Sequence, residues 1–153
     1  MEYHQIFERA LALIGGGRPA LLSTIGEEGY PHTRWMTPAA LPRLKGRVYA
    51  VTARGFPKAA EIEADPRVQW LFQAADFSEV TTLEGKARLV DDPAFSAEVL
   101  KAIGPHLAAF WRLNTNPSAL RVIETEVESV SILFPLRAER YSARADGEEA
   151  TRG

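Results

Sequence analysis

Three cationic side chains stand at positions where they could hold an anion. Arg34 lies in "GYPHTRWMTP" (29–38), where the residue types favour a β-strand. Arg54 and Lys58 lie in "TARGFPK" (52–58), a glycine-containing loop that leads into a helical pattern. The backbone N–H groups at a helix N-terminus attract anions, and the guanidinium fork of arginine suits phosphate or carboxylate. Together these residues predict a phosphate-type site.

Arg34 also has a simpler interpretation. On a strand, Tyr30, His32, Arg34 and Met36 would share one face. A mixed face of this kind is typical of a sheet surface in water, where the arginine binds nothing. The residue types leave both alternatives open, and the same holds for Lys58, because lysines near helix starts are usually solvated.

Other kinds of site have little support. The chain has no cysteine, which excludes disulfides, thiolate catalysis and Cys-ligated zinc, and its three histidines are too far apart to predict a metal site. The acidic residues between Glu61 and Asp65 are expected on the solvent side of a helix, and those between Glu124 and Glu128 on an exposed strand. No serine has a G-x-S-x-G context, and "GGGR" (15–18) lacks the P-loop lysine. No catalytic acid or base is therefore predicted.

Composition and charge indicate an ordinary globular domain. The 153 residues are 46% hydrophobic and 25% charged, and the net charge of −2 gives no positive field for nucleic acid or an anionic membrane. No apolar run approaches the ~20 residues that span a bilayer, and residues 1–14 lack the features of a signal peptide. We expect one domain over residues 1–141, a flexible C-terminal tail over 142–153, and a cytoplasmic location.

The elements that must position the cations are mainly strands joined by hairpins. "GEEG" (26–29) separates two β-rich runs, Gly85 is expected at a bulge, and Asp92 followed by Pro93 predicts a helix start. This order suits a mostly antiparallel sheet closed into a barrel, with helices at its edges. We expect strands at 20–25, 30–37, 47–52, 67–73, 78–91 and 119–134, the last with a break near 124–127, and helices at 2–14, 58–65 and 92–103.

Three stretches in this order carry a family resemblance. They are "LLSTIGEEGYPHTRWM" (21–36), "RVYAVTARGFPKAAEIEADPRVQWLF" (47–72) and "TTLEGKARLVDDP" (81–93), and they resemble the pyridoxamine 5′-phosphate oxidase-like FMN-binding split-barrel superfamily, in its general-stress-protein branch. The resemblance covers about residues 20–93. It implies a mostly β (β+α) fold, a six-stranded antiparallel split β-barrel with flanking helices, which forms a homodimer with FMN at the interface.

The resemblance also implies a cofactor site. Arg34 matches an arginine that contacts the FMN phosphate or ribityl chain, and Lys58 matches the phosphate-binding lysine. Residues 35–37 match a segment that lies along the isoalloxazine ring, and Arg54 could replace a cation that the pattern otherwise lacks. The implied cofactor-binding residues are Arg34, Trp35, Met36, Thr37, Val51, Thr52, Arg54 and Lys58.

The chain departs from the oxidase pattern at several positions. Phe56 and Pro57 replace a serine and an arginine, Ala39 stands at the position of a substrate lysine, and Val80 at that of a glutamine facing the flavin. Pyridoxamine phosphate oxidase activity is therefore not expected. The expected function is a flavin-dependent oxidoreductase that uses FMN on an unidentified small molecule. The alternatives are a non-catalytic flavin-binding, stress-related protein and a split-barrel protein that uses deazaflavin or haem.

Overall fold

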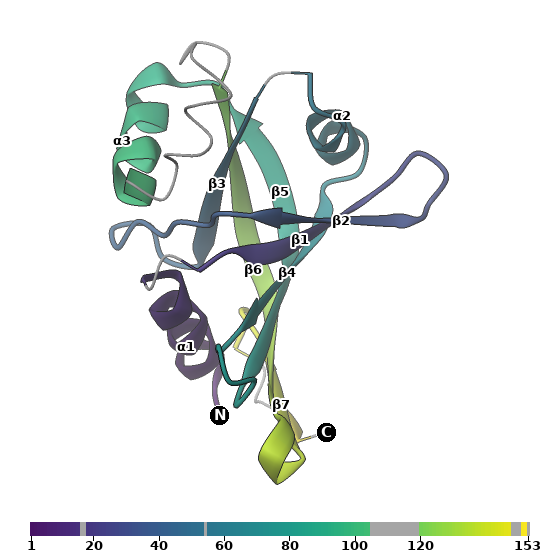
Figure 1. Cartoon of the computed structure of the whole chain (residues 1–153), viewed down its shortest axis with the longest axis vertical. Helices are drawn as coiled ribbons and strands as arrows, with labels where there is room; N and C mark the ends of the chain where they lie inside the picture. The colour runs from purple at the N-terminus through teal and green to yellow at the C-terminus, as the bar shows by residue number, and fades with distance from the viewer. Residues whose placement is uncertain (16–17, 54, 105–119, 148–150, 153) are drawn as a thin grey trace.

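The fold is a twisted antiparallel sheet with three helices packed on it (Figure 1). The computed structural model describes residues 1–15, 18–53, 55–104, 120–147 and 151–152. The elements in chain order are α1 (Tyr3–Gly15), β1 (Ala20–Ile25), β2 (Pro31–Met36), β3 (Arg47–Ala53), α2 (Pro57–Ala64), β4 (Arg67–Gln73), β5 (Val80–Val90), α3 (Pro93–Ile103), β6 (Leu120–Phe134), a 3-10 turn η3 (Pro135–Arg137), β7 (Glu139–Arg144) and β8 (Thr151–Arg152).

The long strand β6 organises the sheet. The strand order is β2-β1-β4-β5-β6-β7-β8, and β3 pairs with β6 outside this path. The first half of β6 pairs with β3 and its second half with β7, both antiparallel. Among the described strands β2 pairs only with β1 and β3 only with β6, so the sheet does not close. The expected closure into a barrel is therefore wrong for the described strands, because the edges of β2 and β3 stay unjoined. The predicted mostly β, antiparallel split-barrel fold with flanking helices is confirmed, and β7 and β8 add to the six expected strands.

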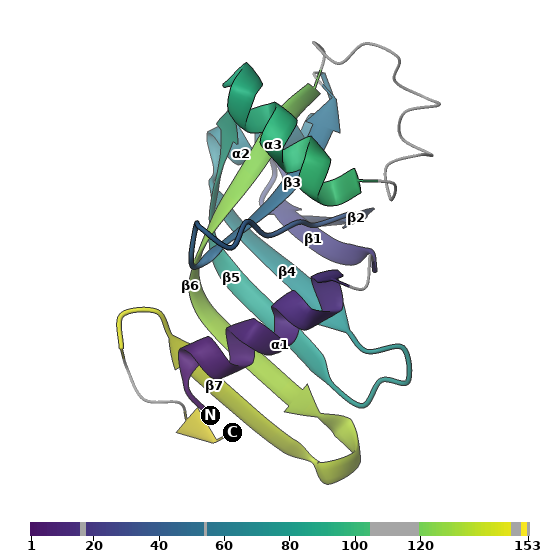
Figure 2. The same ribbon diagram turned by 90° about the vertical axis from the view of Figure 1, so that its left-hand side faces the viewer.

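Two helices cover two cores on the sheet. Figure 2 shows α1 lying across the lower part of the sheet and α3 across the upper part. The helix α1 buries Ile6, Phe7 and Ala10, because residues three and four apart share one face of a helix. The helix α3 buries Val99 and Ile103 against β3 and β6. Within the described residues, no helix has both the length and the apolar character needed to cross a bilayer.

The short helix α2 brings its side chains over the hairpin of β1 and β2. It follows β3, buries only Ala59 and Ile62, and contacts β1 and β5. It ends before Asp65 and Pro66, since a residue that precedes proline avoids helical dihedrals. This packing places the first two turns of α2 near the middle of β2.

Two local predictions are confirmed. Gly85 lies at a register shift between β5 and β6, and a Cβ atom built on it would lie 2.0 Å from the backbone oxygen of Glu126. The Asp92 carboxylate accepts hydrogen bonds from the N–H groups of Ala94 and Phe95, which caps α3. In both cases the local backbone geometry accounts for the residue type.

Three expectations need correction. The strand β6 runs unbroken through residues 124–127. Glu124 is not exposed, because it lies opposite Tyr49 in the β3–β6 ladder and accepts the Tyr49 hydroxyl at 2.9 Å and Nε of Arg88 at 2.8 Å. The expected start of the tail at residue 142 falls inside β7, where Ala143 is buried and pairs with Val130.

Candidate functional site

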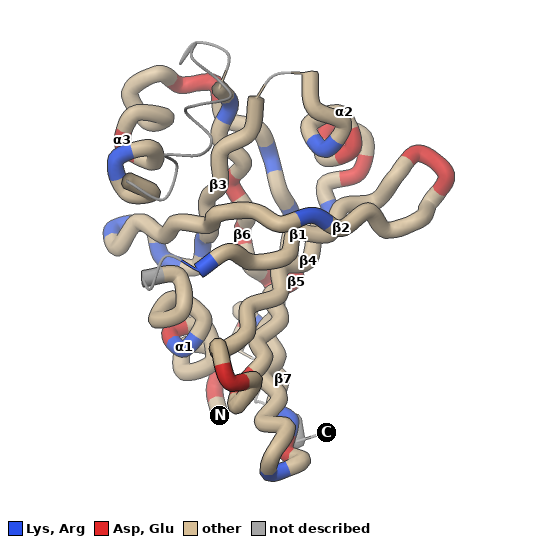
Figure 3. Tube along the Cα trace, viewed as in Figure 1, with Lys and Arg blue, Asp and Glu red and all other residues tan. Residues whose placement is uncertain are grey.

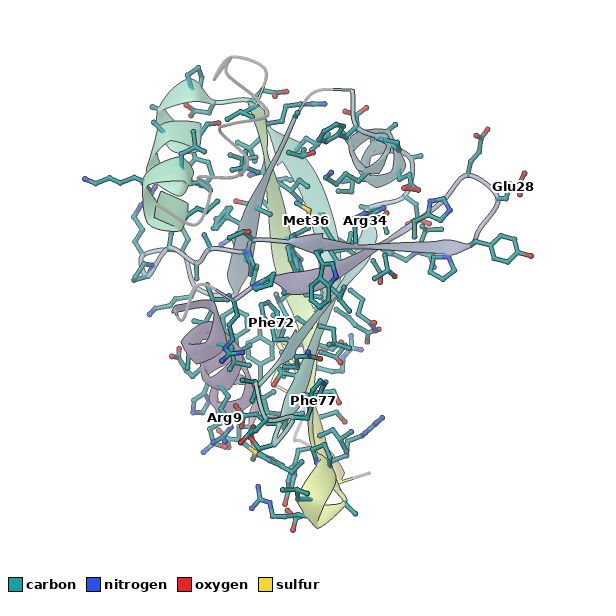
Figure 4. All side chains as sticks on the ribbon, viewed as in Figure 1. Arg9, Glu28, Arg34, Met36, Phe72 and Phe77 are labelled. Atoms are coloured by element: carbon teal, nitrogen blue, oxygen red, sulfur yellow. The ribbon has the colours of Figure 1, made fainter. Side chains whose placement is uncertain are left out.

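Arg34 is a held, partly buried cation on the edge strand β2. Its Nη1 donates to Oγ1 of Thr24 at 2.7 Å and to the Leu22 carbonyl at 3.3 Å, and its Nη2 donates to Oε1 of Glu61 at 3.3 Å. Figure 4 shows the labelled side chain on the side of β2 that faces α2. A guanidinium has five N–H donors, so Nε and one Nη2 hydrogen have no acceptor within the described part of the chain. Arg34 is therefore anchored and still has donors to offer.

Lys58 is a second cation beside it. The residue is half-buried in the first turn of α2, and its Nζ lies 4.4 Å from the centroid of the Phe56 ring. Burial lowers the pKa of Lys58, and the positive charge of Arg34 lowers this pKa further. Within the described residues Lys58 has no acidic partner. Two neighbouring cations, one without a counter-ion, favour binding of an anion at this point.

The start of α2 adds to the positive potential. Phe56 is the N-cap residue and offers no side-chain acceptor to the first turn, and Pro57 follows it inside the helix. The positive end of the helix dipole therefore lies beside Lys58 without an acidic residue in the first turn to neutralise it. In Figure 3 the basic segment of β2 lies close to the charged segments of α2.

Glu61 forms a charged cluster with Arg34, Lys58 and His32, and the sequence alone did not indicate this role for Glu61. Its side chain is 11% exposed, Oε1 accepts from Thr24 at 3.2 Å and from Arg34, and Oε2 lies 2.7 Å from Nδ1 of His32. The His32 ring lies over Gly26, where an added Cβ would come within 2.5 Å of it. The expectation that Glu61 faces solvent was wrong, because α2 packs that face against β1 and β2. Its position three residues after Lys58, on the same helix face, was the available signal.

The other predicted site residues differ in accessibility. On β2, Trp35 is 60% exposed and Met36 packs against the core, while Thr37 follows the strand and is half-buried. On β3, Val51 packs under α3 and Thr52 is buried. Arg54 lies outside the described residues. The structure thus places Arg34 and Lys58 on either side of Glu61, and Val51 and Thr52 could meet a ligand only through their backbone.

A cleft borders the cluster on the hairpin side. It has a volume of about 770 Å³ and lies between the β1–β2 hairpin and α2, with Pro57, His32 and Glu61 in its wall. Within the described residues, no group of three or more His, Asp and Glu side chains is arranged to hold a metal ion. The chemistry available here is recognition of an anion next to an open cleft.

Comparisons with known proteins agree with the fold. The family model described as pyridoxamine 5′-phosphate oxidase matches residues 6–134. A protein from Clostridium acetobutylicum related to general stress protein 26 has 14% identity and a TM-score of 0.75, with 94% of this chain and 96% of that chain covered. General stress protein 26 from Bacillus anthracis has 21% identity and a TM-score of 0.68, with 84% and 93% covered.

A third similar structure carries a description of its ligand. It is a pyridoxamine 5′-phosphate oxidase-related, FMN-binding protein from Nostoc punctiforme, with 17% identity, a TM-score of 0.71, and 97% of this chain and 94% of that chain covered. No curated protein matches the sequence. At these identities the three structures show a shared fold.

Proposed function

Because the chain belongs to the pyridoxamine 5′-phosphate oxidase family, we propose that it is a flavoprotein that binds FMN through Arg34 and Lys58. The observation that carries this proposal is the half-buried Lys58, which has no acidic partner among the described residues and stands three residues before Glu61, the residue that contacts Arg34. The Nostoc punctiforme protein of the same fold, which is described as FMN-binding, supports the choice of ligand.

The residues present fit the phosphate end of FMN. Nε and the remaining Nη2 hydrogen of Arg34 are available donors, Lys58 supplies a second charge, and the start of α2 adds its dipole. Phe56 and Pro57 do not replace the lost hydroxyl and cation directly. Instead the Phe56 ring contacts Lys58 through a cation–π interaction, and Pro57 begins the helix. Arg54 stays a prediction as a further phosphate ligand.

We infer that the bound flavin serves an oxidoreductase reaction on a small molecule. When bound, FMN supplies hydride or electron transfer, and the protein supplies binding, orientation and electrostatics. Arg34 and Lys58 would neutralise the phosphate, and residues 35–37 together with Val51 and Thr52 would lie along the cofactor, as the family resemblance implies. No described residue is assigned as a proton donor or acceptor.

A second candidate function is non-catalytic flavin binding. It is favoured by Ala39, which stands at the position of the oxidase's substrate lysine, is buried, and pairs with Tyr49 in a β-bridge. The methyl group of Ala39 offers no charge and no hydrogen bond to a substrate. Steady-state oxidation of a reduced nicotinamide by FMN-loaded protein separates the two functions: turnover supports the oxidoreductase, and bound but inert flavin supports the binding protein.

The cofactor is tested by spectroscopy. Protein purified without added cofactor is expected to show a flavin absorption spectrum or, if it is colourless, to quench FMN fluorescence and gain thermal stability when FMN is added. A folded protein that gives neither response contradicts the proposal. A deazaflavin or haem spectrum would identify one of the other cofactors instead.

We also propose that the protein forms a homodimer through the face that carries β2. Trp35, on the face of β2 opposite to Arg34, is 60% exposed, and β2 has one strand partner in the described sheet. A second copy could cover this aromatic side chain, since aromatic residues are enriched at interfaces. Sedimentation equilibrium is expected to give twice the chain mass, and Trp35→Arg is expected to lower it. The cytoplasmic location stays a prediction.

A further inference from the structure

We propose that Glu61 determines how strongly the site selects a phosphate-bearing flavin over one without phosphate, because its carboxylate competes with the ligand's phosphate for Arg34. This inference rests on the proposed binding of FMN. Glu61 would thus be a specificity-determining residue that weakens phosphate binding rather than one that supports it.

The contact between Glu61 and Arg34 makes this competition direct. Oε1 of Glu61 lies 3.3 Å from Nη2 of Arg34, and no other carboxylate among the described residues contacts this guanidinium. The two side chains are only 11% and 23% exposed. Water and salt therefore screen the carboxylate poorly at this point, so its charge acts on any anion bound nearby.

Arg34 does not depend on Glu61 for its position. Its Nη1 is held separately by Thr24 at 2.7 Å and by the carbonyl of Leu22 at 3.3 Å. Glu61 is in turn held by His32 through its other oxygen. A glutamine at position 61 would keep Oε1 as an acceptor for Thr24 and Arg34, so the main change would be the loss of one negative charge.

The charge balance gives the direction of the effect. The formal charges of Arg34, Lys58 and Glu61 sum to one positive charge, whereas a phosphate monoester carries close to two negative charges at neutral pH. Removal of the Glu61 charge leaves two positive charges for the phosphate. Riboflavin has the same ring and ribityl chain without the phosphate, so its affinity should not respond.

The experiment compares two ligands on three proteins. Dissociation constants for FMN and for riboflavin are measured by fluorescence quenching on the wild type, Glu61→Gln and Glu63→Gln. Glu63 is the matched control, because it lies on the same helix but is 60% exposed and pairs with Arg121 at 3.1 Å. Glu61→Gln is expected to bind FMN about fivefold more tightly, with riboflavin unchanged. Glu63→Gln is expected to change neither constant.

A second variant guards against a folding defect. Glu61→Ala removes the same charge, and it should shift FMN affinity in the same direction; urea unfolding checks that each variant is folded. An unchanged or weaker FMN affinity in the folded variants overturns the role of Glu61, with the proposed function intact. Failure of the folded wild type to bind either flavin overturns the proposed function itself, and the inference with it.

Discussion

Nη2 of Arg34 lies 3.3 Å from Oε1 of Glu61, and this ion pair joins the edge strand β2 to the short helix α2. Because of this pair, neither residue has the environment that its position in the sequence suggested. Arg34 is neither a freely solvated charge nor an unoccupied anion ligand, since part of its guanidinium is already bound. Glu61 is not a surface acid of α2, because it faces the sheet. The remaining positive charge of the cluster is that of Lys58.

Lys58→Met tests the phosphate end of the site. Loss of the Lys58 ammonium group is expected to raise the FMN dissociation constant at least about tenfold. The riboflavin dissociation constant should change little, because only FMN carries the phosphate. Fluorescence quenching measures both constants. Lys86→Met is the matched control, since Lys86 is 62% exposed on β5 and lies 4.0 Å from Glu128. Equal losses for FMN and riboflavin would contradict a phosphate contact.

Phe56 is predicted to hold Lys58 in place through its ring. Nζ lies 4.4 Å from the ring centroid, and an exposed cation–π pair contributes about 0.5–1 kcal/mol. Phe56→Leu, which keeps apolar bulk without the ring, is expected to weaken FMN binding roughly two- to fivefold by the same estimate. Phe56→Tyr keeps an aromatic face and is expected to bind as the wild type does. If the leucine and tyrosine variants bind FMN alike, the ring has no such role.

Gly85→Ala is expected to destabilise the fold. The added Cβ would lie 2.0 Å from the backbone oxygen of Glu126, and neither the strand nor its partner can give way without loss of ladder hydrogen bonds. We expect the free energy of unfolding, measured in urea, to fall by about 2 kcal/mol or more. Glu84→Ala, at the preceding exposed position, is the control and should change it by less than about 1 kcal/mol. A stable Gly85→Ala protein would mean that the bulge tolerates a side chain.

The protein is expected to lose folding stability at alkaline pH because of the buried Tyr49 phenol. Burial and the hydrogen bond to Glu124 raise the pKa of its phenol well above the ordinary value, so the folded protein keeps a proton that the unfolded chain releases near pH ~10. The raised pKa of Tyr49 therefore contributes its full share to the free energy of unfolding below pH ~10, and this share is lost as the pH rises above that value.

The measurement is urea unfolding between about pH 9 and pH 11. Above pH ~10 the unfolding free energy of the wild type should fall more steeply than that of Tyr49→Phe, by up to about 1.4 kcal/mol per pH unit. All other titrating groups are common to both proteins and cancel in the difference. Parallel curves would show that the phenol ionises normally in the folded state.

Local features of the chain were predictable because they depend on local geometry. The hairpin around residues 26–29, the bulge at Gly85 and the cap at Asp92 each follow from the conformations that a few neighbouring residues allow. The order of strands and helices from α1 to β6 also followed from hydrophobic period and turn residues, whereas β7 and β8 were not predicted. For Arg34 and Lys58, the residue types allowed either an anion ligand or a solvated charge.

The partners of the charged residues depend on contacts between segments that are far apart in the chain. The acidic residues between Glu124 and Glu128 alternate along β6, as is typical of an exposed strand. Glu124 is nevertheless buried, because β3 brings Tyr49 opposite it and β5 brings Arg88. Glu61 was expected on the solvent side of its helix. Because α2 packs back onto the β1–β2 hairpin, Glu61 instead pairs with Arg34. Periodicity shows which side chains share a face, and long-range packing determines what covers that face. The local pattern of the chain therefore predicted the elements from α1 to β6 and singled out two cations, whereas long-range packing placed the Glu61 carboxylate against Arg34.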